Sequence, residues 1–121
     1  MQASITGIYI KNNVIYYQLR LDNQSPIDYD MELLRFFIRD KKKGKRTATQ
    51  ENELTPLYVA GNIRQVKANS QCVIVVALEK FTIPDAKFLT VQIQEHNGGR
   101  HLQLKVSNKK IIKAIPLPDL K

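Results

Sequence analysis

The sequence contains no tryptophan and a single cysteine, and no apolar run is long enough to cross a membrane as a helix. A spanning helix needs ~18 or more apolar residues, whereas the longest apolar stretch here, residues 70–81, is interrupted by Glu79 and Lys80. Without tryptophan the chain has no indole ring to stack on sugars, which disfavours a carbohydrate-binding module. One cysteine excludes an internal disulfide. We expect Cys72, which lies in an apolar run, to be a framework residue rather than a reactive thiolate.

Motifs of the common enzyme classes are also missing. There is no glycine-rich phosphate loop, no Gly-x-Ser-x-Gly, no Cys-x-x-Cys and no His-Glu-x-x-His. His96 and His101 are predicted to face each other across a turn and could hold a divalent ion. A structural zinc site takes four ligands, however, and a catalytic one takes three. We therefore predict no catalytic activity, no metal and no cofactor, with two solvated histidines beside the turn.

The chain has 121 residues, 43% hydrophobic and 25% charged, which is typical of one globular domain. Its net charge of +8 is concentrated in one turn, because five of the 19 basic residues lie between Lys41 and Arg46. Outside this turn the chain has 14 basic and 11 acidic residues. The positive charge is therefore a local patch on a nearly balanced body.

This basic patch allows two interpretations. It consists of Lys41, Lys42, Lys43, Lys45 and Arg46. It can contact nucleic-acid phosphates, or it can be a soluble hairpin tip whose charge steers an acidic protein partner and discourages aggregation. A single-strand binder would interleave aromatic rings for base stacking, and the patch has none. We expect at most weak, nonspecific DNA contact.

Alternation of apolar and polar residues with a period of two predicts β-strands along most of the chain. The first hairpin has a turn at Asn12–Asn13, because asparagine tolerates the left-handed backbone that a tight turn requires. This turn pairs Ile10 with Ile15 on the core face. It also places Tyr9 across from Tyr16 on the opposite face.

A second hairpin is predicted around Gly98–Gly99. A two-residue turn there pairs Ile93 with Leu104 and Val91 with Val106, so that apolar residues face apolar residues, except that Glu95 faces Leu102 near the turn. A slip of one residue would mix the two faces. We expect these four side chains to be buried together.

Further strands are predicted over residues 31–40, 46–49, 57–60 and 71–78, and the last of these is apolar on both faces, as a doubly covered central strand would be. No convincing amphipathic helix is predicted. Pro116 and Pro118 are expected to end ordered pairing, since proline lacks an amide donor. We therefore predict an all-β fold, an antiparallel β-sandwich of the immunoglobulin-like type. Residues 1–115 form its single domain and residues 116–121 form a C-terminal tail.

Exposed aromatic side chains are the best interface candidates. Tyr9 and Tyr16 form a pair on the face away from the core, and Phe37 lies between Arg35 and Arg39 on a partly polar face. Tyrosine, phenylalanine and arginine are enriched among interface anchors. The alternative is that loops of the same domain cover these faces.

Over nearly the whole chain, the sequence resembles that of a known family. The strongest similarity runs from the apolar strand into the basic turn, Leu33–Lys43 and Lys45–Ala48. Other matching stretches are Gly7–Ile10, Val14–Leu19, Asn23–Asp30, Thr55–Val59, Val66–Gln71, Lys80–Asp85 and Gln94–Leu102. In these framework and turn residues the chain resembles the TraN family of transfer proteins encoded by conjugative transposons of Bacteroides-type bacteria.

This resemblance implies a structural subunit of a conjugative DNA-transfer apparatus, comparable to the β-sandwich subunit of the type IV secretion outer-membrane core. It implies a periplasmic, outer-membrane-associated location and contacts with other core subunits. Because the sequence begins without an export signal, we expect the domain to be the C-terminal part of a longer exported protein. The alternative function is an accessory DNA-binding domain that uses the basic turn.

Overall fold

Two β-sheets and a single helical turn make up the computed structural model, which describes residues 1–40, 52–80 and 87–117. The strands are β1 (Gln2–Lys11), β2 (Val14–Asn23), β3 (Tyr29–Asp40), β4 (Asn52–Leu54), β5 (Tyr58–Ala60), β6 (Gln65–Val66), β7 (Ser70–Glu79), β8 (Lys87–Glu95), β9 (Leu102–Ser107) and β10 (Ile115–Pro116), with the helical turn α1 (Asn108–Ile111) between β9 and β10. The predicted all-β class is confirmed.

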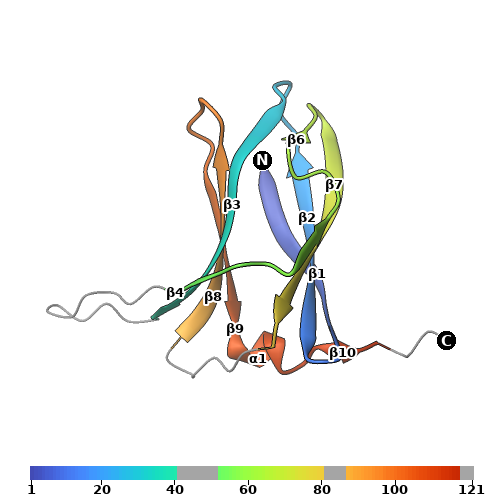
Figure 1. Cartoon of the computed structure of the whole chain (residues 1–121). Helices are drawn as coiled ribbons and strands as arrows, with labels where there is room; N and C mark the ends of the chain where they lie inside the picture. The colour runs from blue at the N-terminus through green and yellow to red at the C-terminus, as the bar shows by residue number, and fades with distance from the viewer. Residues whose placement is uncertain (41–51, 81–86, 118–121) are drawn as a thin grey trace, which may run out of the picture.

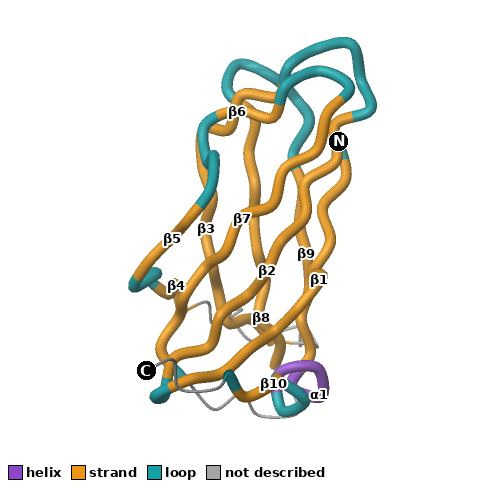
Figure 2. Tube along the Cα trace, turned by 90° about the vertical axis from the view of Figure 1, so that its right-hand side faces the viewer, coloured by secondary structure: helices purple, strands orange, loops and turns teal. Residues whose placement is uncertain are grey.

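The first sheet has the strand order β10-β1-β2-β7-β5. The second has the order β4-β3-β8-β9, with β6 paired to β3. All pairs are antiparallel except the short one between β1 and β10. The two sheets form separate layers (Figure 1), and β5, β7, β2 and β1 lie side by side in the layer that faces the viewer in Figure 2.

One hydrophobic core joins the inner faces of the two sheets. Its buried members alternate along the strands, as expected for half-buried β-structure. They are Ile15, Tyr17, Leu19, Leu21, Tyr29, Phe36, Val66, Ile74, Val76, Leu78, Leu89, Val91, Ile93, Val106 and Ile111. Leu104 is partly buried and packs against this core, so the four residues predicted to be buried together do meet.

The first hairpin has the predicted turn and register. Asn12 and Asn13 adopt φ values of 51° and 64°, the left-handed region that asparagine tolerates better than most residues. Ile10 pairs with Ile15, and Tyr9 pairs with Tyr16.

The second hairpin has a different register from the predicted one. Ile93 pairs with Leu102, and Val91 pairs with Leu104, which is a shift of two residues. The turn is centred nearer Asn97, whose φ of 52° is left-handed. A shift of two keeps every side chain on its face, so the apolar pattern alone could not distinguish the two registers.

Three further expectations need correction or fall outside the described residues. Pro116 does not end pairing, because it lies opposite Ile10 in the edge strand β10. Its missing amide is on the side of β10 that faces solvent, so no hydrogen bond to β1 is lost. The outer face of β7 is only partly covered, because Val73 on that face is 48% exposed whereas Ala77 is buried. The strand predicted over residues 46–49 lies outside the described residues.

Candidate functional site

An apolar row crosses the outer face of the first sheet from edge to edge. Strand register places its members side by side, one from each of the five strands: Ile115, Tyr9, Tyr16, Ala77 and Tyr58. We call this set the outer row. It lies on the side away from the core, because Tyr17 and Val76, the next residues along β2 and β7, are buried.

The outer row is exposed most at its two ends. Tyr58 is 60% exposed and Ile115 is 57% exposed, whereas Tyr9 and Tyr16 are half-buried and Ala77 between Tyr16 and Tyr58 is buried. The ring of Tyr9 lies over Gly7, where a Cβ atom would come within 2.7 Å of the ring. The glycine therefore lets the tyrosine lie flat along the sheet.

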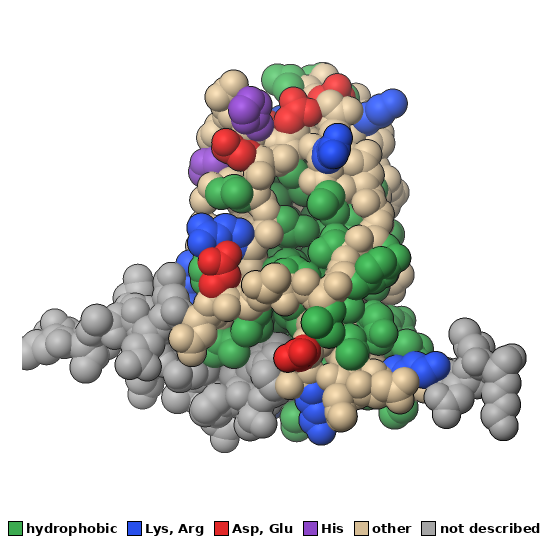
Figure 3. Space-filling view, in the orientation of Figure 1, with side chains coloured by type: hydrophobic (Ala, Val, Ile, Leu, Met, Phe, Trp, Pro, Cys, Tyr) green, Lys and Arg blue, Asp and Glu red, His purple; other side chains and the backbone are tan. Residues whose placement is uncertain are grey.

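Beside the outer row, β7 adds Val73 and Val75 to the same face, because they alternate with buried residues of that strand. Hydrophobic side chains are also visible over β7 and between the two sheets in the space-filling view (Figure 3). Contiguous apolar groups on a sheet face are a usual mark of a protein-binding surface. The predicted pair Tyr9 and Tyr16 belongs to this surface.

The outer face of the second sheet is different in character. Phe37 lies there between Arg35 and Arg39, as predicted, but it is only 6% exposed. Both guanidinium groups cover its ring, with the Cζ atoms of Arg35 and Arg39 at 4.9 and 5.0 Å from the ring centroid. The prediction of an exposed aromatic anchor is therefore wrong at this position, because long arginine side chains shield the ring from water.

Arg35 is held in this position by β4. Its Nε and Nη2 atoms donate to the two carboxylate oxygens of Glu53, each at 2.9 Å. Hydrogen bonding to Arg35 is the main reason why the pKa of Glu53 is lowered. The bidentate geometry fixes the guanidinium plane above Phe37.

A shallow hollow lies at the edge of the same face, and the sequence interpretation missed it. It has a volume of about 440 Å³ and is lined by Phe88, Lys105, Ser107 and Lys110. The Nζ atom of Lys105 lies 5.0 Å from the centroid of the Phe88 ring. The alternation Phe88-Thr90-Gln92 along one face of β8 was the signal that could have found this ring.

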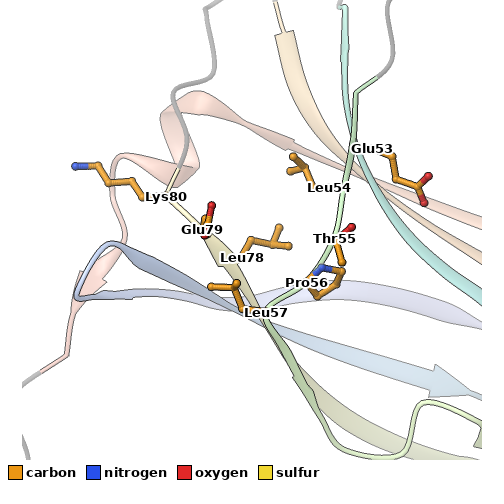
Figure 4. Close-up of a pocket in the computed structure, with 8 residues that line it drawn as sticks. All are labelled: Glu53, Leu54, Thr55, Pro56, Leu57, Leu78, Glu79 and Lys80. Atoms are coloured by element: carbon orange, nitrogen blue, oxygen red, sulfur yellow. The ribbon is translucent and has the colours of Figure 1, made fainter.

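A second hollow, of about 390 Å³, lies where the chain crosses from β4 to β5. Glu53 lies at one end and Lys80 at the other, with Leu54, Leu57 and Leu78 between them (Figure 4). The amide of Leu57 donates to the carbonyl of Ala77, which ties the crossover to β7.

The two histidines do not form a pair, because the hairpin register is shifted. His96 Nδ1 lies 3.7 Å from the Glu32 carboxylate, whereas His101 Nδ1 accepts a hydrogen bond from the amide of Glu95. Within the described residues, no group of three His, Cys, Asp or Glu side chains is arranged to hold a metal ion.

Instead, the turn between β8 and β9 is built on an ion pair. Glu95 is 8% exposed and pairs with Arg100, whose Nε donates to Oε2 at 3.0 Å. The Arg100 guanidinium lies over the ring of buried Tyr29, whose hydroxyl donates to the Arg100 carbonyl. At Gly98 a Cβ atom would lie 2.0 Å from the Glu95 carboxylate, so a larger residue there would have to displace the Glu95 side chain. The arrangement is a structural network rather than a reactive site.

This ion pair predicts an acid-sensitive contribution to stability. Hydrogen bonding to Arg100 is the main cause that lowers the pKa of Glu95. Its contribution is therefore present above the ordinary glutamate pKa of about 4.3 and is lost as the pH falls through the lowered value. We expect Glu95→Gln to lower the free energy of unfolding at pH 7, and to lower it less at pH 3. Urea titrations at both pH values measure this difference, and an equal loss at both would contradict the prediction.

Two buried tyrosines predict opposite effects of the same substitution. Tyr29 donates a hydrogen bond to a backbone carbonyl, whereas the Tyr17 hydroxyl has no hydrogen-bond partner within the described part of the chain. We expect Tyr29→Phe to lower the free energy of unfolding by about 1–2 kcal/mol. We expect Tyr17→Phe to be neutral or stabilising, since it removes an unsatisfied polar atom. Equal losses in urea titrations of the two variants would contradict this.

The remaining predicted residues are placed as follows. Cys72 packs against the core, and burial raises the pKa of its thiol, which disfavours the reactive thiolate. The basic patch, Lys41 to Arg46, lies outside the described residues. In the part of the chain that is described, no helix has the length and apolar character needed to span a membrane.

Comparison with known proteins identifies the family but not a function. Residues 1–116 match the family described as domain of unknown function DUF4138, and the chain belongs to that family. No curated protein matches the chain.

Proposed function

We propose that this domain is a non-enzymatic structural subunit of a conjugative DNA-transfer apparatus, similar to type IV secretion, and that it acts through protein–protein contacts. The single observation that carries the proposal is the outer row with its neighbours Val73 and Val75. An apolar, tyrosine-containing sheet face with two side chains more than half exposed is suited to docking another protein. It offers no arranged acid–base pair or nucleophile.

We also propose that the fold is of the immunoglobulin-like type. With the two-residue strands β6 and β10 set aside, the sheet orders are β1-β2-β7-β5 and β4-β3-β8-β9. These correspond to the orders A-B-E-D and C′-C-F-G of immunoglobulin-like sandwiches. Such domains commonly serve as binding modules that use a sheet face, a sheet edge or the loops.

The biological setting comes from the resemblance to TraN proteins. On that basis the domain acts in the periplasm, associated with the outer membrane, and its partners are other core subunits of the apparatus. The protein oligomerises only within this assembly, and the outer row packs against a neighbouring subunit.

A mating experiment tests the proposal. A donor strain that lacks the gene is complemented with the full-length protein carrying Tyr16→Ala and Tyr58→Ala together. Truncating interface anchors typically costs ~2 kcal/mol or more in binding, so transfer frequency should fall by at least tenfold at unchanged protein level. The matched control is Ile27→Ala, an equally exposed apolar residue in the β2–β3 connection. Normal transfer with the double variant would contradict the proposal.

DNA binding through the basic turn is the second candidate function, and five positive charges in six positions favour it. Contact with about five phosphates predicts a slope of roughly −4 to −5 for log affinity against log salt on duplex DNA. Weak, salt-labile binding is consistent with the structural role. Tight or sequence-dependent binding at high salt would favour the DNA-binding alternative.

A further inference from the structure

The second sheet carries a basic hollow at an open edge, separate from the outer row. The hollow is lined by Phe88, Lys105, Ser107 and Lys110. Both lysine side chains are exposed, and Lys105 extends over the Phe88 ring. An apolar floor with two ammonium groups and a hydroxyl at its sides is suited to a carboxylate-bearing side chain.

Basic side chains reach the hollow from two elements. Lys105 belongs to β9 and Lys110 to α1, and Arg39 lies on the same face of the sheet. Register places Arg39 beside Phe88, and Thr90 separates Phe37 from Lys105 on adjacent strands. The described acidic side chains of this sheet are engaged elsewhere, since Glu53 binds Arg35 and Glu32 lies 3.7 Å from His96. Neither lines the hollow, so its two lysines favour an anionic partner.

The hollow adjoins the edge of the sheet. The order of the second sheet ends at β9, and within the described residues no strand pairs with the outer side of β9. Six residues long, β9 offers enough backbone for an added strand. Strand addition supplies main-chain hydrogen bonds, while pockets beside the edge select alternate side chains of the guest.

We infer that the β9 edge and the basic hollow together bind an extended, acidic segment of a partner protein. The segment adds a strand to β9, and its carboxylates contact Lys105 and Lys110. A protein segment fits better than single-stranded nucleic acid, because the Phe37 ring is covered by two arginines and cannot stack on bases. The inference extends the proposed role as a protein-binding subunit, but it concerns a different face from the outer row.

Fluorescence anisotropy with the 121-residue chain tests the inference. The probe is a labelled eight-residue peptide of alternating glutamate and valine, and the comparison ligands are a lysine–valine peptide and an eight-nucleotide oligo(dT). We expect the acidic peptide to bind best at low salt. The variant Lys105→Gln with Lys110→Gln should weaken that binding by at least tenfold.

A matched control removes the same charge elsewhere. Lys109→Gln with Lys113→Gln changes two exposed lysines in and just after α1, outside the hollow, and should weaken binding by less than about twofold. Equal losses in the two double variants would show a nonspecific charge effect and overturn the inference. Preferential binding of oligo(dT) would overturn it in favour of nucleic acid.

Amide hydrogen exchange checks the strand-addition step. With the acidic peptide bound, we expect slower exchange of amides along β9, because an added strand protects an edge. Binding without any new protection in β9 would overturn strand addition. Tyr16→Ala with Tyr58→Ala should leave peptide binding unchanged, so a failure here is distinguishable from a failure of the proposed outer-row contact.

Discussion

Replacing Phe37 by alanine is expected to lower the free energy of unfolding by about 3 kcal/mol, although Phe37 faces away from the core. Its ring is almost fully buried beneath Arg35 and Arg39, and large-to-small changes at buried aromatic positions cost ~3–5 kcal/mol. Both cation–π contacts are lost with the ring. Equilibrium urea denaturation measures the change.

Tyr58→Ala is the control for this prediction. Tyr58 is also an aromatic residue on an outer face, but it is 60% exposed, so its truncation should change stability by less than about 0.5 kcal/mol. If Phe37→Ala has as small an effect as Tyr58→Ala, the two arginines do not form a stable cover over the ring. Phe37 would then return to being a candidate for an interface.

Replacing Asn23 by alanine is expected to cost about 2–3 kcal/mol. Asn23 is 1% exposed at the end of β2, and its Nδ2 atom donates to the carbonyls of Ile27, Val66 and Lys67 at 2.9–3.3 Å. Alanine leaves the buried Val66 carbonyl and two part-buried carbonyls without this donor, and a buried carbonyl without a donor costs ~1–3 kcal/mol. Thermal and urea denaturation measure the loss.

A matched control for Asn23 is Asn62→Ala. The Asn62 Oδ1 atom accepts hydrogen bonds from the amides of Arg64 and Gln65, but the residue is exposed and water can replace it. Its substitution should therefore cost under about 1 kcal/mol. Equal effects at the two positions would show that Asn23 does not hold the β2–β3 connection against β6.

The two hairpins show how far the side-chain pattern predicts this fold. At Asn12–Asn13, alternation and turn chemistry agree on one register, and the structure has it. At Gly98–Gly99, the two glycines suggested a turn centred one residue beyond the observed turn, which shifts the strand register by two residues. The predicted register placed Glu95 opposite Leu102, its one polar–apolar mismatch, and the observed turn instead pairs Glu95 with Arg100. That mismatch was the sequence feature that could have indicated the observed register.

Face assignment was more predictable than burial. The sequence pattern placed Tyr16 and Phe37 correctly on outer faces, because alternation determines direction. It could not show that Phe37 is covered, since the cover comes from its own strand neighbours Arg35 and Arg39. Arg35 in turn is fixed by Glu53 of the neighbouring strand β4. The outer row also depends on pairing between strands far apart in sequence, such as β5 with β7.

Photo-cross-linking from the outer row would report directly whether this face contacts a neighbouring subunit. A photoreactive phenylalanine analogue replaces Tyr58 in the full-length protein, in cells that carry the transfer apparatus, and replaces Ile27 in a control strain. We expect a light-dependent adduct from position 58 to another component of the apparatus and none from position 27. The absence of any adduct from position 58, in an assembled and transferring apparatus, would contradict the claim that this face binds a neighbouring subunit.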